Sequence, residues 1–475
     1  MSAIASSRAA PAGGTANAGA AAAADAYLAA LAELRARGRF GIKLGLGRTR
    51  ALLAALGDPH QAIPGVLIGG TNGKGSVQAM VAAVLRAGGV RVGQTPKPHL
   101  VSYRERIVVE GHPITPADFG RLIDEVLRAA RAVPARLGAP TEFELLTAAA
   151  FRWFADSGVQ LGVIEVGLGG RLDATNAWDG GVAAITSVGL DHTEYLGTTL
   201  AAIGREKAAI IKRGDLAVSG VEGAGASPVR GRARRLDVPL VEVQPLDVEA
   251  MDRAGITVRH PTHGTLRVGL LGRHQAMNAA VAVAVLEALD RKGLAPLEPE
   301  ALRAGLAAVR WPGRLELLSI GREAVDVVLD GAHNLDGAHA LGRALSDLRP
   351  LLAGGQATLL MGTLGDKDAA GMVRALAGCG ALAGARVVTT TVPDAPRSLT
   401  AAGLAAIWRE AVDLETSVEA IDDPSEALAR ALAVARAGGG PLICCGSLYL
   451  VGAVRGRLVD DPELRDPLPS VRAGR

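Results

Sequence analysis

The segment Gly69–Ser76, with the sequence GGTNGKGS, has the residue types of a loop that binds phosphate groups. It follows the apolar run Val66–Ile68 and precedes the amphipathic stretch Ser76–Ala87, which predicts a strand, a loop and a helix in that order. Small residues let successive backbone N–H groups converge on phosphate oxygens, and the helix N-terminus adds positive potential. The predicted nucleotide-binding residues of this loop are Gly70, Thr71, Asn72, Gly73, Lys74, Gly75 and Ser76.

Two kinds of side chain in this loop could take part in chemistry. Lys74 would place a positive charge against the β- and γ-phosphates of ATP, and the hydroxyl of Ser76 or Thr71 would bind Mg²⁺. Gly75 separates Lys74 from Ser76, so the spacing departs from the usual Gly-Lys-Ser/Thr order. The alternative is a flexible glycine turn that binds nothing.

Glu165 is a carboxylate inside the apolar strand predicted for Gln160–Val166. An unpaired carboxylate is costly to bury, so Glu165 needs a positive partner. A Mg²⁺ ion shared with ATP phosphates would be one, because carboxylate and phosphate oxygens suit that ion. An ion pair with Arg171 is the alternative.

His192 follows the strand predicted for Val182–Ser187 and lies next to Asp191. Ligands of α/β proteins bind at the carboxyl edge of the strands, so this position favours metal binding by His192 over a purely structural, hydrogen-bonded role. Lys207 lies sixteen residues after Asp191 on a predicted helix. Taken alone, Lys207 would be a solvent-exposed lysine.

The loop GTNGKGS resembles the ATP loop of the Mur ligase superfamily, and most closely that of the folylpolyglutamate and dihydrofolate synthases. Residues 165–176, EVGLGGRLDATN, resemble a signature of the same family at every position. The resemblance implies that His192 binds a second Mg²⁺. It also implies that CO₂ carbamylates Lys207, which replaces an ammonium with a carboxylate-like ligand for that ion.

Further segments resemble the family over most of the chain. Residues 141–151, TEFELLTAAAF, and 95–100, TPKPHL, resemble segments near the pterin and acceptor site, although Lys97 stands where the family has Ser. Lys97 could attract the glutamate carboxylates of a folate, or it could simply be solvated. Three segments, with the sequences GRHQAMN, WPGRLE and LDGAHN, resemble family segments that face ATP, and they imply nucleotide contacts for Asn278, Arg314, Asp330 and His333. Residues 361–368, MGTLGDKD, resemble a later family segment, and Asn334 by itself would be a helix cap.

Apolar runs that alternate with amphipathic stretches predict an α/β fold. The chain has 475 residues, of which 49% are hydrophobic, enough for two or three domains. We predict a disordered tail over residues 1–24, a doubly wound N-terminal domain with the phosphate loop over 25–308, and a smaller Rossmann-like C-terminal domain over 313–475. Residues 238–271 are predicted to form antiparallel strands.

Composition argues against several other classes of protein. The formal net charge is +3 and no basic face runs through the chain, so we expect no nucleic-acid partner. The 3 cysteines have no zinc or disulfide spacing, and no apolar run reaches the length of a membrane span. We therefore expect a cytoplasmic monomer that acts on small molecules.

The resemblance implies an ATP-dependent ligase that joins L-glutamate to a folate or dihydropteroate carboxylate through an acyl-phosphate. Its catalytic residues would be Lys74, His192, Lys207 and Arg314, and its metal ligands Ser76, Glu165, His192 and Lys207, with two Mg²⁺ ions. One alternative is a peptidoglycan-precursor ligase of the same fold. Another is a nucleotide-binding switch without ligase chemistry, which would leave Glu165, His192 and Lys207 unexplained.

Overall fold

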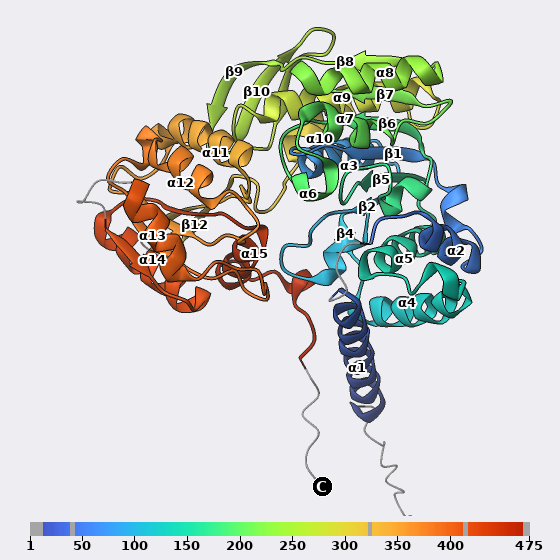
Figure 1. Ribbon diagram of the computed structural model, residues 1–475, viewed down its shortest axis with the longest axis horizontal. Coiled ribbons are helices and arrows are strands. Elements are labelled where there is room, and N and C mark those ends of the chain that lie inside the picture. Colours follow the sequence, from blue (N-terminus) through green and yellow to red (C-terminus); the bar gives the residue numbers. More distant parts are fainter. Residues whose placement is uncertain (1–12, 39–42, 322–324, 412–416, 469–475) are drawn as a thin grey trace, which may run out of the picture.

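The computed structural model describes residues 13–38, 43–321, 325–411 and 417–468. These residues form two α/β units, each built around its own sheet, and a small antiparallel sheet lies beside both of them (Figure 1). The chain passes from the first unit to the second between helix α10 (Pro299–Ala308) and strand β12 (Glu316–Ile320).

The first sheet has 8 strands in the described residues, in the order β4-β3-β2-β5-β1-β6-β7-β8. The strands from β2 to β8 in this order are parallel, whereas β3 and β4 pair antiparallel at one edge. In chain order the strands are β1 (Gly65–Gly69), β2 (Val92–Thr95), β3 (Val108–Val109), β4 (His112–Pro113), β5 (Leu161–Glu165), β6 (Gly181–Ile185), β7 (Leu216–Ser219) and β8 (Leu240–Glu242).

Helices cover both faces of this sheet, so its central strands are buried on both sides. Every residue of β1 and of β5 is buried, which explains why these strands are continuous apolar runs. Two separate hydrophobic clusters fill the two faces. The helices are α1 (Gly13–Gly38), α2 (Gly47–Ala55), α3 (Lys74–Ala87), α4 (Pro116–Ala129), α5 (Glu142–Asp156), α6 (Thr193–Leu196), α7 (Leu200–Ala208), α8 (Ala226–Leu236), α9 (Gln275–Arg291) and α10.

The second sheet has 6 strands in the described residues, in the order β12-β13-β17-β14-β15-β16, and only β12 is antiparallel to its neighbour. It too is packed on both faces by separate apolar clusters. Its remaining strands are β13 (Val325–Leu329), β14 (Thr358–Met361), β15 (Arg386–Thr389), β16 (Val418–Ala420) and β17 (Leu442–Cys445). Its helices are α11 (Leu335–Leu348), α12 (Ala369–Ala377), α13 (Ala401–Ala411), α14 (Pro424–Gly438) and α15 (Leu448–Leu458). The predicted fold class, two α/β units of which the first carries the phosphate loop, is confirmed.

Strands β9 (Asp247–Asp252), β10 (Gly255–His260) and β11 (Gly264–Val268) form the antiparallel sheet predicted for residues 238–271. The first part of that range differs from the prediction, because β8 joins the first sheet as a parallel strand. At the turn between β9 and β10, Arg253 forms an ion pair with Asp326 of β13, with 2.6 Å between Nη2 and Oδ1. The antiparallel sheet therefore fastens the first unit to the second (Figure 1).

The N-terminal segment differs from the prediction of a disordered tail over residues 1–24. Helix α1 begins at Gly13, inside that range, and residues 1–12 lie outside the described part of the chain. Alanine has the highest helix propensity of any residue, so an Ala-rich run extends a helix once its other end is anchored. Tyr27 supplies that anchor, because its buried ring packs edge-on against Phe119 of α4 at 5.5 Å.

Candidate active site

A cavity of about 1910 Å³ lies between the carboxyl edge of the first sheet and the second unit. Pockets for a single drug-sized ligand are roughly 300–1,000 Å³, so this cavity has room for more than one substrate. Every site residue predicted from the sequence lines it, including Asn278 and Arg314. The fold thus brings together residues that are up to 263 positions apart, from Gly70 to His333.

The phosphate loop is held in place by the segment that follows β6. The backbone N–H of Asn72 donates to Oγ of Ser187 at 2.9 Å, and Oγ1 of Thr186 donates to the carbonyl oxygen of Asn72 at 2.6 Å. The Thr71 hydroxyl donates to the carbonyl oxygen of Gly189 at 3.2 Å and accepts from the N–H of the same residue at 3.0 Å. These bonds occupy the Thr71 hydroxyl.

Gly73 shows why the loop needs glycine at this position. Its φ is +85°, and a Cβ atom there would lie 2.3 Å from Oδ1 of Asn278. Asn278 is itself held by a hydrogen bond of 2.8 Å from its Nδ2 to Oε1 of Gln275. The start of helix α9 therefore packs directly against the loop.

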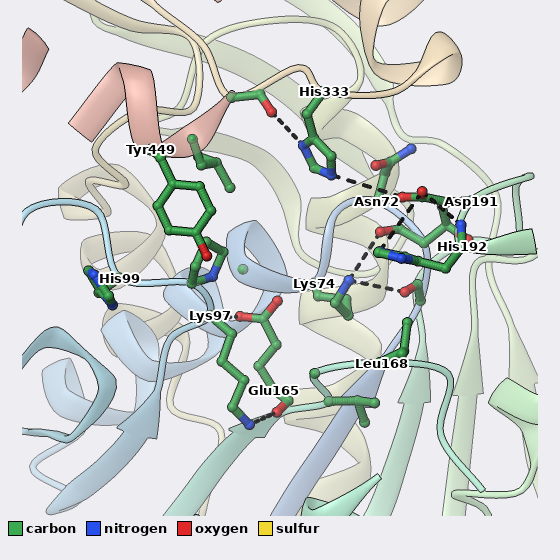
Figure 2. A pocket seen from close by; sticks show the side chains of 18 of the residues that line it. Asn72, Lys74, Lys97, His99, Glu165, Leu168, Asp191, His192, His333 and Tyr449 are labelled. Carbon is green, nitrogen blue, oxygen red and sulfur yellow. Dashed lines mark hydrogen bonds and ion pairs between the residues drawn. The ribbon is translucent and has the colours of Figure 1, made fainter. Parts of the chain in front are cut away.

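Lys74 lies at the first position of α3, and its ammonium turns back onto the loop (Figure 2). Nζ donates to the carbonyl oxygens of Gly70 at 3.1 Å and Thr71 at 3.0 Å. Burial lowers the pKa of Lys74, while the nearby charges of Glu165 and Asp191 act in the opposite direction. The lysine charge therefore lies against the start of the phosphate loop.

Glu165 ends strand β5 and pairs with Ile68 of β1, so it lies beside the start of the phosphate loop. The side chain is buried, and burial raises its pKa against the opposing charges of Lys74 and Lys97. Oε2 accepts a hydrogen bond of 3.2 Å from the backbone N–H of Lys97. The alternative of an ion pair with Arg171 is wrong, because Arg171 pairs with Glu206 at 2.9 Å.

Asp191 is one of the points where the two units meet at the cavity (Figure 2). Its Oδ1 lies 2.7 Å from Nζ of Lys367, and its Oδ2 accepts from Nδ2 of Asn334 at 3.1 Å. Burial acts to raise the pKa of Asp191, but the hydrogen bond and charge of Lys367 outweigh it and hold the pKa well below its usual range. Asp191 is therefore an anion in the folded protein.

His192 lies beside Asp191, with 3.9 Å between its Nε2 and Oδ1 of Asp191. Its backbone is in the left-handed region at φ +48°, which is uncommon for a residue with a side chain and points to a local function. Burial lowers the pKa of His192, so the neutral imidazole predominates at neutral pH. A neutral imidazole has a lone pair that a metal ion can use.

Arg314, Asp330 and His333 reach the cavity from the second unit and the segment that leads into it. Nδ1 of His333 lies 2.7 Å from the carbonyl oxygen of Gly331, so this nitrogen carries the proton and Nε2 faces Asp191 at 3.9 Å (Figure 2). Burial lowers the pKa of His333 to about 4. The Asp330 carboxylate accepts hydrogen bonds from the backbone N–H groups of Leu315 at 2.8 Å and Ala332 at 2.9 Å. The first of these bonds holds the residue next to Arg314 in place.

Lys207 is buried in the cavity wall, not exposed as a helix lysine taken alone would be. Burial lowers its pKa to about 7, and the positive charge of Lys74 acts in the same direction. A large fraction of the side chain is then a neutral amine at physiological pH. A neutral amine is the form that reacts with CO₂.

The sequence did not indicate the contacts that Asp191, Lys367 and Asn334 make with one another. Asn334 does cap helix α11, as its local pattern predicted, by accepting from the N–H of Gly337 at 2.8 Å. It also donates to Asp191 and, at 3.3 Å, to Oδ1 of Asn72. The motifs containing these residues were visible in the sequence, but their contacts were not.

The residues predicted to bind metal fit Mg²⁺ only in part. Ser76 is buried, and its hydroxyl and the Glu165 carboxylate are hard oxygen ligands on adjacent segments of the cavity wall. Among the described residues, no group of three or more His, Cys, Asp or Glu side chains is arranged to hold a metal ion. Phosphate oxygens, and at Lys207 a carbamate, would have to complete any such site.

A glycine-rich loop at the edge of a parallel sheet, faced by a second α/β unit across a shared cavity, is the arrangement of a nucleotide-dependent ligase. Residues 68–286 match the Mur ligase middle domain, and residues 313–448 match the Mur ligase, glutamate ligase domain. The fold and site therefore define an ATP-dependent ligase of the Mur type.

Comparison with individual proteins places the chain within that class. It is 36% identical to the dihydrofolate synthase/folylpolyglutamate synthase of Mycobacterium tuberculosis over 88% of this chain and 91% of that protein. It is also 36% identical to the Bacillus subtilis protein of the same name, over 74% of this chain and 83% of that protein. The chain belongs to the folylpolyglutamate synthase and dihydrofolate synthase family.

Solved structures agree with this assignment. The folylpolyglutamate synthase of M. tuberculosis complexed with ADP and AMPPCP matches with a TM-score of 0.81 and 33% identity, over 93% of this chain and 100% of that one. The E. coli FolC protein in complex with DHPP and ADP matches with a TM-score of 0.75 and 29% identity, over 90% of this chain and 97% of that one. The predictions of family and of an ATP-dependent ligase are confirmed.

Proposed function

We propose that the protein joins the amino group of L-glutamate to the carboxylate of dihydropteroate or of a reduced folate, through an acyl-phosphate. The observation that carries the proposal is the one cavity in which the phosphate loop, buried Glu165 and the second unit's Asp330 and His333 all take part. Its size suits ATP together with a second substrate. The names of the relatives support the choice of acceptor.

The reaction has two steps. A carboxylate oxygen of the acceptor attacks the γ-phosphorus of ATP, the bond to the β,γ-bridging oxygen breaks, and ADP leaves. The glutamate amine then attacks the acyl carbon, phosphate leaves with the C–O bonding electrons, and the new amide nitrogen loses a proton. Each step moves negative charge onto phosphate oxygens, so positive groups must be in place beforehand.

Lys74 and Arg314 are the cationic residues that we assign to this task. Lys74 lies in the phosphate loop itself, and Arg314 reaches the cavity beside Asp330. Burial strengthens the attraction between these two cations and phosphate oxygens, because charges interact more strongly away from water. The loop glycines supply backbone donors, because the backbone N–H groups of Thr71 and Asn72 already donate to Ser187. Asn278 supports the loop from the side of α9.

We assign a first Mg²⁺ to Ser76 and Glu165, since the Thr71 hydroxyl is already bonded to Gly189. We assign a second Mg²⁺ to His192 and to Lys207 in its carbamylated form, supported by the lowered pKa values of both side chains. Bound Mg²⁺ would neutralise phosphate charge and orient the transferred group. Glu165 and His192 hold their positions through strand β5 and the segment after β6.

An ADP-release assay tests the proposal. Purified protein is given ATP, Mg²⁺ and L-glutamate with either dihydropteroate or tetrahydrofolate, and product mass is measured. We expect ADP release that depends on glutamate and on at least one of the two acceptors, with a mass gain of one glutamyl residue. Release that is independent of the acceptor, or none with either acceptor, would refute the proposal.

We further propose that the protein is a cytoplasmic monomer. A single chain supplies every residue of the cavity described above, and its three cysteines are buried and free, which suits a reducing compartment. No helix in the described part of the chain is long and apolar enough to span a membrane. Light scattering of the purified protein with and without ATP would test the monomer.

A further inference from the structure

Lys97 lines the cavity but has no role in the reaction proposed above. It follows β2, whose parallel pairing with β5 places it alongside Glu165. The backbone N–H of Lys97 donates to the Glu165 carboxylate, and its ammonium donates to the backbone carbonyl oxygen of the same residue (Figure 2). The side chain therefore lies along Glu165 and points away from Lys74 (Figure 2).

The ammonium has donor capacity that the protein does not use. A lysine ammonium carries three N–H donors. Within the described residues, Nζ of Lys97 has one acceptor, the carbonyl oxygen of Glu165, and it lies 4.8 Å from the centre of the Phe143 ring. Burial lowers the pKa of Lys97 to about 8, while the nearby charges of Asp173 and Glu165 act in the opposite direction. In the described part of the chain, neither carboxylate forms an ion pair with Lys97. Two donors are left for another partner.

That partner has to come from the cavity. Lys97, Phe143 and Asp173 all line it, and Lys97 remains partly accessible from it. An ammonium held below the protein surface with two open donors is unfavourable unless oxygen atoms approach it. A serine at this position, as the family pattern has it, is too short to reach the Phe143 ring, so this arrangement depends on the lysine.

We propose that Lys97 is a specificity-determining residue that binds the acceptor substrate, donating hydrogen bonds to a carbonyl or carboxylate oxygen of the molecule that lies against Phe143. This inference rests on the proposed function. The oxygen can belong to the heteroaromatic ring of a pteroyl compound or to a carboxylate of its glutamyl part. Lys97 acts on acceptor binding and leaves ATP and glutamate binding to other residues.

The test is a set of initial-rate measurements on the wild-type enzyme and on Lys97→Met, which keeps the length of the side chain and removes the charge. We expect KM for dihydropteroate or tetrahydrofolate to rise about 10- to 100-fold, as loss of a charge-assisted hydrogen bond does. KM for ATP and for glutamate should stay within about twofold of the wild-type value. Lys97→Ser should behave like Lys97→Met, and Lys97→Arg should recover part of the loss.

Lys292→Met is the matched control. The ammonium of Lys292 also donates to a backbone carbonyl, that of Gly214 at 2.6 Å, but it lies outside the cavity. This variant should leave all three KM values unchanged. If Lys97→Met leaves the acceptor KM unchanged, or raises the KM of all three substrates equally, the inference is overturned while the proposed function stands. A wild-type enzyme that is inactive with every pteroyl acceptor refutes both.

Competitive inhibitors identify the source of the oxygen. 6-Methylpterin has the ring without the carboxylates, and p-aminobenzoylglutamate has the carboxylates without the ring. If Lys97 binds the ring oxygen, Lys97→Met weakens only the first inhibitor, and if it binds a carboxylate, only the second. Unchanged inhibition constants for both compounds would contradict any direct contact between Lys97 and the acceptor.

Discussion

Lys367 and Asp191 form an ion pair of 2.7 Å that joins the second unit to the first at the rim of the cavity. Both side chains are largely buried, with exposed fractions of 9% and 11%. Asn334 donates to the same carboxylate and to Asn72 of the phosphate loop. The relative position of the two units is therefore coupled directly to the loop that is expected to bind ATP.

Replacing Lys367 by Met should weaken the contact between the two units at Asp191. Removing one partner of a buried pair leaves the other charge unpaired, which costs about 3–5 kcal/mol. Because the pair lies between two units, we expect the units to separate before either one unfolds. We predict a fall in kcat of at least about tenfold and a larger radius of gyration by small-angle X-ray scattering. An unchanged radius together with unchanged kcat would show that the pair does not hold the units together.

Lys74→Ala should nearly abolish ATP-dependent turnover, because on the proposed mechanism the transferred phosphoryl group loses the cation of the phosphate loop. Loss of one such electrostatic contact costs about 10²- to 10³-fold in kcat. The fold should persist, since Nζ bonds only to loop carbonyls, and circular dichroism can verify this. Wild-type activity in the purified variant would refute the assignment of the loop.

Glu165→Gln tests the proposed first Mg²⁺ site. An amide oxygen has the shape of the carboxylate but no net charge, so Mg²⁺ should bind more weakly. We expect either no activity or a Mg²⁺ titration shifted to higher concentration at saturating ATP. The hydrogen bond from the Lys97 N–H can persist with the amide oxygen, so the melting temperature should change little. An unchanged Mg²⁺ titration would remove Glu165 from the metal site.

Lys207→Ala should be nearly inactive if the carbamate is a metal ligand, and acetate should partly restore activity by occupying the vacated position. Lys207→Arg should not be rescued, because the guanidinium fills the space and keeps a positive charge. Full activity of Lys207→Ala without acetate, alongside a crystal structure with an unmodified lysine, would exclude this residue from the mechanism.

The lowered pKa of Lys207 also predicts how carbamylation of this residue depends on pH. Carbamylation forms an N–C bond between neutral amine and CO₂ and releases one proton. With a pKa of about 7, the amine is protonated and unreactive below that pH. Enzyme depleted of CO₂ should therefore regain more activity from added bicarbonate at pH 8 than at pH 6. Lys207→Ala should show no such recovery at either pH.

Arg104→Met should destabilise the contact between the C-terminal segment and the first unit. Arg104 is 3% exposed, and its guanidinium bonds to Oδ1 of Asp466 at 3.1 Å and to the carbonyl oxygen of Glu463 at 2.6 Å. Loss of a buried charged network of this kind costs about 2–4 kcal/mol, so the midpoint of urea unfolding should fall. Arg465→Met is the control, because its pair with Asp460 is exposed and should contribute little. Equal effects of both variants would argue against a role for the buried pair.

The sequence alone was sufficient for the features that depend on neighbouring residues. The order of strand, glycine-rich loop and helix around Lys74 follows from local hydrophobic periodicity and from the backbone freedom of glycine. The position of Glu165 at the end of a buried strand follows from the same pattern. These patterns extend over about ten residues, so they can be recognised in the sequence without knowledge of the fold. The family resemblance connects them to ATP.

The tertiary structure decided everything that depends on which distant segments meet. The pairing of Asp191 with Lys367 joins positions 176 residues apart in the chain, and no local pattern specifies it. The same holds for Lys97, whose sequence context left open whether it was solvated, and for Lys207, whose burial and lowered pKa come from packing. Helix α1 includes residues 13–24 of the predicted tail, and its packing depends on the contact between Tyr27 and Phe119 of α4. Burial and charge pairing are properties of docked surfaces, so they are set only when the two units and their helices come together.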